Sequence, residues 1–165
     1  MKYSIWTVPP APLSTQLQGI IDDLGAKYNA PHFPPHMTLL GSVEAEIEDM
    51  KHKVEKVAKK FVPFEVILGP VSFSTTYYQS VFVRVLSNAS LMQLNLDLKS
   101  AFKLENTVFM PHISLMYGEH DMETREKITH DLIVPQAHFM IEEIQIIPET
   151  TEPNTWKPAA IISLK

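Results

Sequence analysis

The chain has 165 residues, of which 45% are hydrophobic and 20% charged, as in an ordinary globular domain. It contains no cysteine, which excludes disulfides and thiolate metal sites, and its net charge of −5 disfavours a surface that neutralises many phosphates of an extended nucleic acid. No apolar run approaches the roughly 18 residues of a membrane span, and early prolines interrupt any signal-peptide core. We therefore expect a cytoplasmic monomer that contacts neither a membrane nor extended nucleic acid.

The first half of the chain predicts five elements in the order strand, helix, strand, helix, strand. Residues 2–9 combine β-branched and aromatic side chains and favour a strand. A helix follows, which we expect Thr15 and Gln18 to open as a capping box and Gly25 to end. A short apolar strand over residues 36–43, a helix over 46–61 and a strand over 64–74 complete this half.

The second half repeats this order and adds one strand. The expected strands span residues 80–86, 112–118, 138–148 and 157–165; one helix has its apolar positions at 91, 94, 98 and 102, and a shorter one spans 122–132. Because no linker separates the halves, residues 1–165 are predicted to form a single α+β domain. Its two pseudo-symmetric lobes would correspond to residues of about 1–75 and 76–165.

A repeated sequence accompanies the repeated order of elements. Residues 33–40 read FPPHMTLL and residues 109–116 read FMPHISLM, so both follow the pattern Phe-x-Pro-His-apolar-(Thr/Ser)-Leu-(Leu/Met). The two histidines, His36 and His112, lie 76 positions apart, and each falls on the third element of its half. A histidine that serves packing alone has no reason to recur with a hydroxyl residue two positions on. The duplication therefore favours a functional pair.

Strand geometry places each of these histidines beside a hydroxyl. Residues i and i+2 of a strand point to the same face, so His36 lies beside Thr38 and His112 beside Ser114. If the halves pack about a pseudo-two-fold axis, both pairs face one cleft. Such a cleft suits in-line phosphoryl chemistry, because one histidine can take a proton from water, the other can donate to the leaving oxygen, and the hydroxyls can bind phosphate oxygens. The repeat leaves acid and base nearly symmetric; our working assignment has His112 activate water and His36 donate.

In these motifs the chain resembles the two-histidine (2H) phosphoesterase superfamily, whose signature is two His-x-(Thr/Ser) motifs on the lobes of a duplicated fold. Within it, the chain is most similar to cyclic phosphodiesterases that open ADP-ribose 1″,2″-cyclic phosphate and nucleoside 2′,3′-cyclic phosphates. The likeness covers nearly the whole chain, including residues 3–6 (YSIW), 74–82 (STTYYQSVF), 110–117 and 155–156. It implies a two-lobed fold with two mainly antiparallel sheets and outer helices around a central cleft.

The resemblance also implies a set of site residues. His36 and His112 correspond to the catalytic histidines, and Thr38 and Ser114 to the phosphate ligands. Members of this family need no metal, and their products are usually 2′-phosphates (1″-phosphate from the ADP-ribose substrate). We therefore expect no metal and no cofactor in this protein.

Three aromatic side chains are further candidates for substrate contact. The resemblance points to Trp6 on the first strand and to Tyr117 after the second motif. Simple alternation would turn Tyr117 away from the cleft, so it can contribute only if the strand ends or bulges near Gly118. Tyr78 lies in an expected turn, where an aromatic ring could flank a base.

The expected function is metal-independent hydrolysis of a small cyclic-phosphate nucleotide, in nucleotide metabolism or RNA processing. One alternative is a 2′–5′ phosphodiesterase or RNA 2′–5′ ligase-like enzyme acting on oligonucleotides, which the acidic composition disfavours. Another is a catalytically silent nucleotide-binding module, which would tolerate loss of one histidine, whereas both are present here. A two-histidine metal hydrolase would also need carboxylates at motif spacing, which the sequence lacks.

Overall fold

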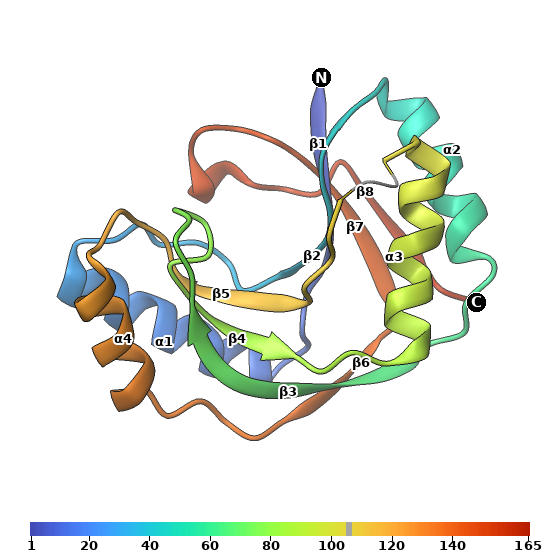
Figure 1. The fold of residues 1–165 in the computed structure, drawn as a ribbon. Coiled ribbons are helices and arrows are strands. Elements are labelled where there is room, and N and C mark those ends of the chain that lie inside the picture. The colour runs from blue at the N-terminus through green and yellow to red at the C-terminus, as the bar shows by residue number, and fades with distance from the viewer. Residues whose placement is uncertain (105–106) are drawn as a thin grey trace.

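The computed structural model describes residues 1–104 and 107–165 (Figure 1). Its strands are β1 (Lys2–Thr7), β2 (Met37–Glu44), β3 (Phe64–Phe73), β4 (Val81–Val85), β5 (His112–Met116), β6 (His138–Ile141), β7 (Glu143–Pro148) and β8 (Ala160–Ser163). Its helices are α1 (Leu13–Tyr28), α2 (Ile47–Ala58), α3 (Ala89–Phe102) and α4 (Met122–Asp131), with a short 3₁₀ turn at Pro153–Thr155. The predicted α+β class is confirmed.

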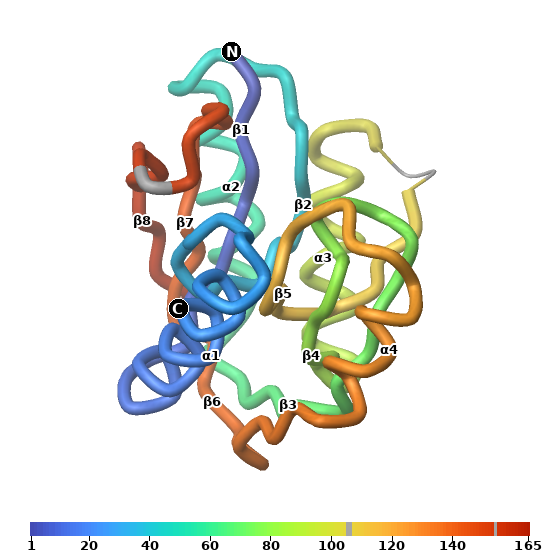
Figure 2. Tube along the Cα trace, turned by 90° about the vertical axis from the view of Figure 1, so that its left-hand side faces the viewer, coloured from blue at the N-terminus to red at the C-terminus, as the bar shows by residue number. Residues whose placement is uncertain are grey.

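The eight strands form one continuous, curled antiparallel sheet in the order β6-β3-β4-β5-β2-β1-β7-β8. The two expected sheets are its two halves, and they are joined where β2 pairs with β5 at Met37 and Ile113. Figure 2 shows β1 and β2 in the middle, with β7 and β8 to one side and β5 and β4 to the other. The two motif strands therefore meet at the centre of the sheet.

The two halves of the sheet do not coincide with the two halves of the sequence, because each half of the sheet contains strands from both halves of the chain. Strand β3 follows β1 and β2 in the chain but pairs with β4, and β7 comes from the second half but pairs with β1. The single strand expected over residues 138–148 is consequently divided at Glu142. Its first part, β6, pairs with β3, whereas its second part, β7, pairs with β1 and β8. A straight strand could not reach both ends of the sheet.

The pairing of residues between strands also repeats with the 76-residue offset that separates the two motifs. In the first half Ile5 pairs with Leu40, Trp6 with Thr38 and Thr7 with Met37. The same three pairs recur 76 positions later as Val81 with Met116, Phe82 with Ser114 and Val83 with Ile113. Both sets contain the same irregularity between their first and second pairs. A pseudo-two-fold axis therefore passes near the Met37–Ile113 pair.

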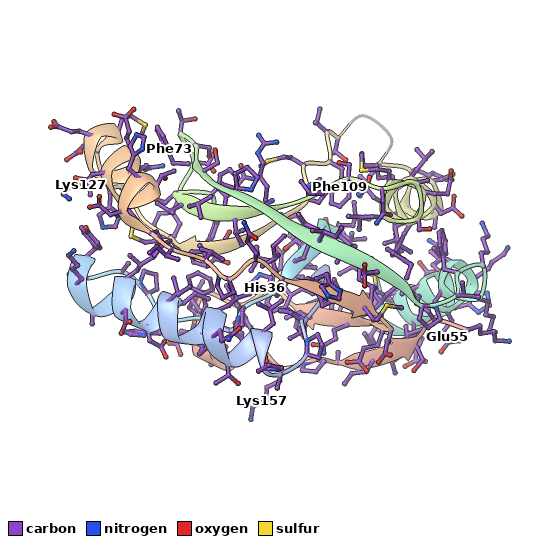
Figure 3. All side chains as sticks on the ribbon, turned by 90° about the horizontal axis from the view of Figure 1, so that it is seen from below. His36, Glu55, Phe73, Phe109, Lys127 and Lys157 are labelled. Carbon is purple, nitrogen blue, oxygen red and sulfur yellow. The ribbon has the colours of Figure 1, made fainter. Side chains whose placement is uncertain are left out.

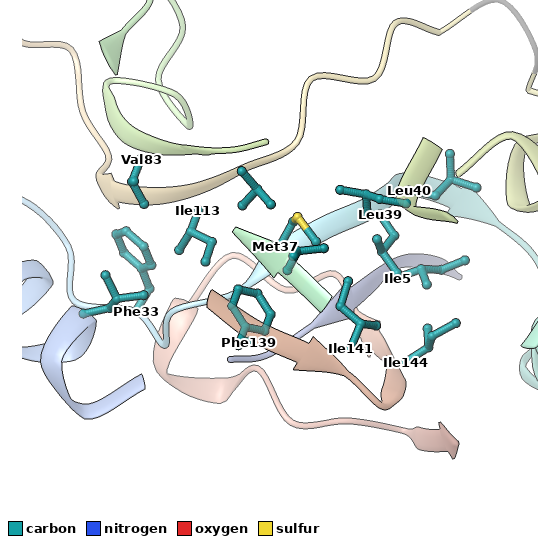
Figure 4. Packing of buried hydrophobic residues seen from close by; sticks show 14 of the residues in the cluster. Ile5, Phe33, Met37, Leu39, Leu40, Val83, Ile113, Phe139, Ile141 and Ile144 are labelled. Carbon is teal, nitrogen blue, oxygen red and sulfur yellow. The ribbon is translucent and has the colours of Figure 1, made fainter. Parts of the chain in front are cut away.

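The core lies between the sheet and the helices that cover it. Figure 4 shows Met37 and Ile113 packed among Ile5, Leu39 and Phe139, and both are fully buried. Helix α1 contacts β5 and α3 contacts β2, so each helix packs on the motif strand of the other half. Viewed from below, α1 and α4 lie at one end of the molecule and α2 and α3 at the other (Figure 3).

The limits of α1 differ from the prediction. The helix begins at Leu13 behind Pro12, which has no side-chain acceptor, so the capping box expected from Thr15 and Gln18 is wrong. The helix also continues past Gly25 to Tyr28 and ends with Asn29 in the left-handed conformation. Gly25 is instead a packing position, because a Cβ there would lie 3.0 Å from the His32 ring.

Candidate active site

The four motif residues form a square on one face of the β2–β5 pair. Met37 and Ile113 pair across the two strands and point into the core. When this register is continued by one residue in each direction, His36 lies opposite Ser114, and Thr38 lies opposite His112. All four side chains therefore point to the other face, and the two histidines occupy a diagonal that in antiparallel pairs spans roughly 7–8 Å. A phosphate at the centre of this square can contact all four.

Identical backbone hydrogen bonds orient the two imidazoles. Nδ1 of His36 lies 2.7 Å from the carbonyl oxygen of Pro34, and Nδ1 of His112 lies 2.7 Å from that of Met110. Because a carbonyl oxygen can only accept, each Nδ1 must carry the proton. The Nε2 atom of each ring is left to exchange protons: it is a base in the neutral ring and an acid in the protonated one.

The surroundings of the two histidines differ. His36 is 7% exposed and stacks face to face on Trp6, with ring centroids 3.6 Å apart and planes inclined by 13°. The ring of Trp156 meets His36 edge-on at 5.9 Å. Burial lowers the pKa of His36 from 6.5 to about 4, against the opposing effect of the Pro34 hydrogen bond, and the nearby His112 lowers it further. His36 is therefore neutral at pH 7.

His112 is only partly buried. Its aromatic neighbour is Phe82, the counterpart of Trp6 in the repeat, which meets it edge-on at 5.2 Å. Burial lowers the pKa of His112 as well, the Met110 hydrogen bond raises it, and the charge of Arg84 lowers it. Of the two histidines, His112 is the one more accessible to water.

A cavity of about 360 Å³, within the range of small-molecule sites of roughly 300–1,000 Å³, opens over this square. The seven side chains singled out in the sequence all line it: Trp6, His36, Thr38, Tyr78, His112, Ser114 and Tyr117. Strand β5 ends at Met116, so Tyr117 escapes the alternation that would have turned it away. Its ring stacks on Phe33 with centroids 3.8 Å apart, and burial raises the pKa of its hydroxyl, which stays protonated.

The hydroxyl of Ser114 links the motif to the neighbouring turn. Its Oγ donates to the carbonyl oxygen of Tyr78 at 2.7 Å. The same turn is held by buried Arg125, whose guanidinium donates to the carbonyls of Ser74 at 2.6 Å and Thr76 at 3.0 Å. Arg125 also donates to the carbonyls of Gly118 and His120, next to Tyr117. One side chain of α4 thus fixes both loops that bring tyrosines to the cavity.

Several lining residues were not identified as candidate contacts from the sequence. Trp156 closes the cavity beside Trp6, with ring centroids 5.3 Å apart. Glu149 follows β7, and its Oε1 accepts hydrogen bonds from Ser4 Oγ at 2.9 Å and from the backbone N–H of Ser42 at 2.8 Å. Trp156 was part of the family resemblance, but Ser4, Ser42 and Glu149 lie 38 to 145 positions apart, and only the pairing of β1 with β2 and β7 brings them together.

Two further features are absent from the described residues. Over residues 1–104 and 107–165, no group of three or more His, Asp or Glu side chains is placed to hold a metal ion. Over the same residues, no helix is both long and apolar enough to cross a bilayer.

The fold and the paired motifs define a phosphoesterase of the two-histidine class. The sequence matches the 2′-5′ RNA ligase superfamily over residues 9–151, a range that includes both motifs, and the chain belongs to this family of 2H phosphoesterases. The resemblance noted in the sequence is confirmed.

Individual relatives agree with this membership. The chain is 23% identical to the cyclic phosphodiesterase of Arabidopsis thaliana over 171 aligned positions, which cover 98% of this chain and 94% of the plant protein. Its fold is similar to that of TT0787 from Thermus thermophilus, with a TM-score of 0.73 and 16% identity, over 99% and 98% of the two chains. It is also similar to E. coli LigT solved with 3′-AMP, with a TM-score of 0.66 and 17% identity, again over 99% and 98%.

Proposed function

We propose that this protein hydrolyses nucleoside 2′,3′-cyclic phosphates, or a closely related small cyclic phosphodiester, to phosphomonoesters without a metal ion. The observation that carries the proposal is the square of His36, Thr38, His112 and Ser114 on one face of the β2–β5 pair. Both Nε2 atoms are free to exchange protons because both Nδ1 atoms are bound to carbonyls. The two hydroxyls complete a site for one phosphate.

The reaction needs one proton acceptor and one proton donor on opposite sides of phosphorus. The acceptor Nε2 takes a proton from water while the water oxygen bonds to phosphorus. The bond from phosphorus to the ribose O3′ breaks, and the donor Nε2–H delivers its proton to that oxygen, which leaves a 2′-phosphate. Thr38 and Ser114 stabilise the charge on the non-bridging oxygens; for this, the Ser114 hydroxyl turns from Tyr78 towards the phosphate.

The unequal burial of the two histidines favours His36 as the base and His112 as the acid. A pKa of about 4 keeps His36 neutral at pH 7, as a base must be. His112 is less buried, and an anionic phosphate beside it raises its pKa and favours the protonated ring. This assignment reverses the working one made from the sequence. It predicts a bell-shaped pH dependence of kcat/KM; a profile that rises monotonically would contradict the paired roles.

The relatives support the proposed reaction. A cyclic phosphodiesterase is similar to this chain over nearly its whole length, and E. coli LigT, a structural neighbour, has been solved with 3′-AMP, a nucleoside monophosphate. A cavity of about 360 Å³ with aromatic walls suits a single nucleotide rather than a longer chain.

The direct test is turnover of adenosine 2′,3′-cyclic phosphate in the presence of EDTA. We expect His36→Ala and His112→Ala each to slow turnover by about 10²- to 10⁴-fold, the usual contribution of a general acid or base. His52→Ala, at an exposed position of α2, is the matched control and should retain full activity. Activity that vanishes in EDTA and returns with zinc would contradict the metal-free mechanism.

A substrate panel separates the proposal from its alternatives. Cyclic nucleotides and 2′–5′ linked oligonucleotides should be compared at equal concentration, with the position of the product phosphate assigned by NMR. Faster cleavage or joining of the 2′–5′ linkage would favour the oligonucleotide enzyme. Tight binding of cyclic nucleotides without turnover, lost equally on substitution of either histidine, would favour the binding module.

A further inference from the structure

The square of motif residues is nearly symmetric, so other residues must decide which way round a substrate binds. The residue three positions after the motif hydroxyl differs between the two halves of the chain. It is Gly41 in the first half and Tyr117, 76 positions later, in the second. Tyr117 fills its side of the cavity with a ring that stacks on Phe33. Gly41 has no side chain, so no ring occupies the corresponding place in the first half.

The cavity lining includes a group of mostly exposed polar residues that we call the polar arm: Ser4, Gly41, Ser42, Glu149 and Thr150. A Cβ built on Gly41 would touch both Ser4 Oγ and Thr38 Cγ2 at 3.7 Å, so the arm directly adjoins the proposed phosphate position. Ser80, which corresponds to Ser4 in the repeat, is fully buried, so the arm exists on one side of the square alone.

Glu149 is held in place by the arm. Its Oε1 accepts hydrogen bonds from Ser4 Oγ at 2.9 Å, from Ser42 N at 2.8 Å and from Ser42 Oγ at 3.0 Å. Ser42 makes these contacts with its backbone in the left-handed region, at φ 55°, which is unfavourable for a residue with a side chain. Oε2 has a single long contact of 3.4 Å to Ser42 Oγ, so it can accept a hydrogen bond from a ligand.

The charge of the arm restricts what it can bind. Apart from the two histidines, Glu149 is the one ionised side chain at pH 7 among the described residues that line the cavity. None of these lining residues is a lysine or an arginine. A second phosphate in the arm would meet a carboxylate without a neutralising cation. A hydroxyl group, by contrast, could donate to Oε2. The arm therefore suits a neutral hydrogen-bond donor next to the cyclic phosphate.

We propose that the polar arm binds the free 5′-hydroxyl of a nucleoside 2′,3′-cyclic phosphate and that Glu149 discriminates against substrates with a 5′-phosphate or pyrophosphate, including ADP-ribose 1″,2″-cyclic phosphate. This specificity rests on the proposed function of the same site. In this orientation the base lies against aromatic side chains of the cavity lining, such as Trp156 and Tyr78, and the 5′ end of the ribose lies at the arm.

The test compares adenosine 2′,3′-cyclic phosphate with its 5′-phosphorylated form. For the wild-type protein we expect kcat/KM to favour the 5′-hydroxyl substrate by about tenfold, mainly through KM, because the exposed Glu149 carboxylate and a 5′-phosphate carry like charges that water screens only in part. In Glu149→Gln, which keeps an acceptor oxygen and removes the charge, the preference should fall to about threefold or less. Glu152→Gln removes an exposed carboxylate outside the cavity lining and should leave the preference at the wild-type value.

Gly41→Val provides a second variant, which acts by the volume of its side chain rather than by charge. It should fill the arm and also abolish the preference, since either 5′ group would then point to solvent. Binding of adenosine 2′-phosphate and adenosine 2′,5′-bisphosphate, measured by calorimetry, tests the same discrimination without turnover. Equal affinity for these two ligands, or an unchanged preference in Glu149→Gln, would overturn the inference. Absent turnover with a clear preference in binding would instead overturn the proposed reaction alone.

Discussion

Acidification should weaken the fold through His36. An unfolded histidine titrates near 6.5, whereas burial against Trp6 lowers the pKa of His36 to about 4. Between these values the unfolded chain binds a proton that the folded chain does not, so the free energy of unfolding falls as the pH falls. From pH 7.5 to pH 5, His36 alone should cost about 2 kcal/mol, and about 3 kcal/mol once the pH is below 4. His36 is 7% exposed, so solvent screening reduces this little.

The change can be measured by urea unfolding at several pH values between 7.5 and 5. Both tryptophans, Trp6 and Trp156, lie against His36, so their fluorescence reports the unfolding transition at the site itself. The His36→Asn variant cannot take up a proton and should lose about 2 kcal/mol less than the wild type over this range. His52→Asn, at an exposed position of α2, should follow the wild type.

Equal losses in the wild type and in His36→Asn would refute the reasoning. They would mean that the folded protein accepts a proton on His36 as easily as the unfolded chain does. The burial that keeps the ring neutral would then have no energetic effect, and the assignment of His36 as the base would lose its support. His112, whose pKa is also lowered by burial, contributes in the same direction in both proteins, so the difference reports His36 together with its coupling to His112.

Three further substitutions test other parts of the site and its supports. Thr38→Val keeps the shape and removes the hydroxyl, so kcat/KM should fall about ten- to a hundredfold with an unchanged melting temperature; full activity would show that Thr38 does not bind the phosphate. Arg125→Met removes the donors of four carbonyls and should lower the free energy of unfolding by about 3 kcal/mol or more, as measured with urea. A loss below about 1 kcal/mol would show that Arg125 does not hold the two loops in place. Asn95→Leu removes the buried amide that donates to the Leu39 carbonyl at 2.7 Å. The free energy of unfolding, measured in the same way, should fall by about 1–3 kcal/mol. A neutral effect would show that this hydrogen bond between α3 and β2 is dispensable.

The centre of the site could be predicted from the sequence because it depends on local geometry. A strand of any register places His36 beside Thr38 and His112 beside Ser114, and the repeat indicates that the two strands are equivalent. The order of the elements follows from apolar spacing in the same way. Local patterns were less reliable at the ends of elements: Thr15 and Gln18 resemble a cap, but packing starts α1 earlier, at Leu13.

The exchange of strands and the polar arm could not be predicted, because both depend on long-range pairing. Nothing in the composition of β3 indicates that it pairs with β4 rather than with β1 or β2. Glu149 is an ordinary carboxylate after a strand until the pairing of β7 with β1 brings it to Ser4, 145 positions away. Its role depends on contacts that no local pattern contains.

The unequal surroundings of His36 and His112 are what the proposed acid and base roles depend on. Both histidines receive the same orientation from the same carbonyl contact, because the repeat preserves backbone geometry. Their proton affinities are set by side chains that the repeat does not preserve. Trp6 stacks flat on His36, whereas its counterpart Phe82 touches His112 by an edge. A symmetric pair would titrate together and split one proton between two equal sites. Trp6 and Trp156 together bury His36 more deeply than Phe82 buries His112, and the proposed division into base and acid rests on this difference.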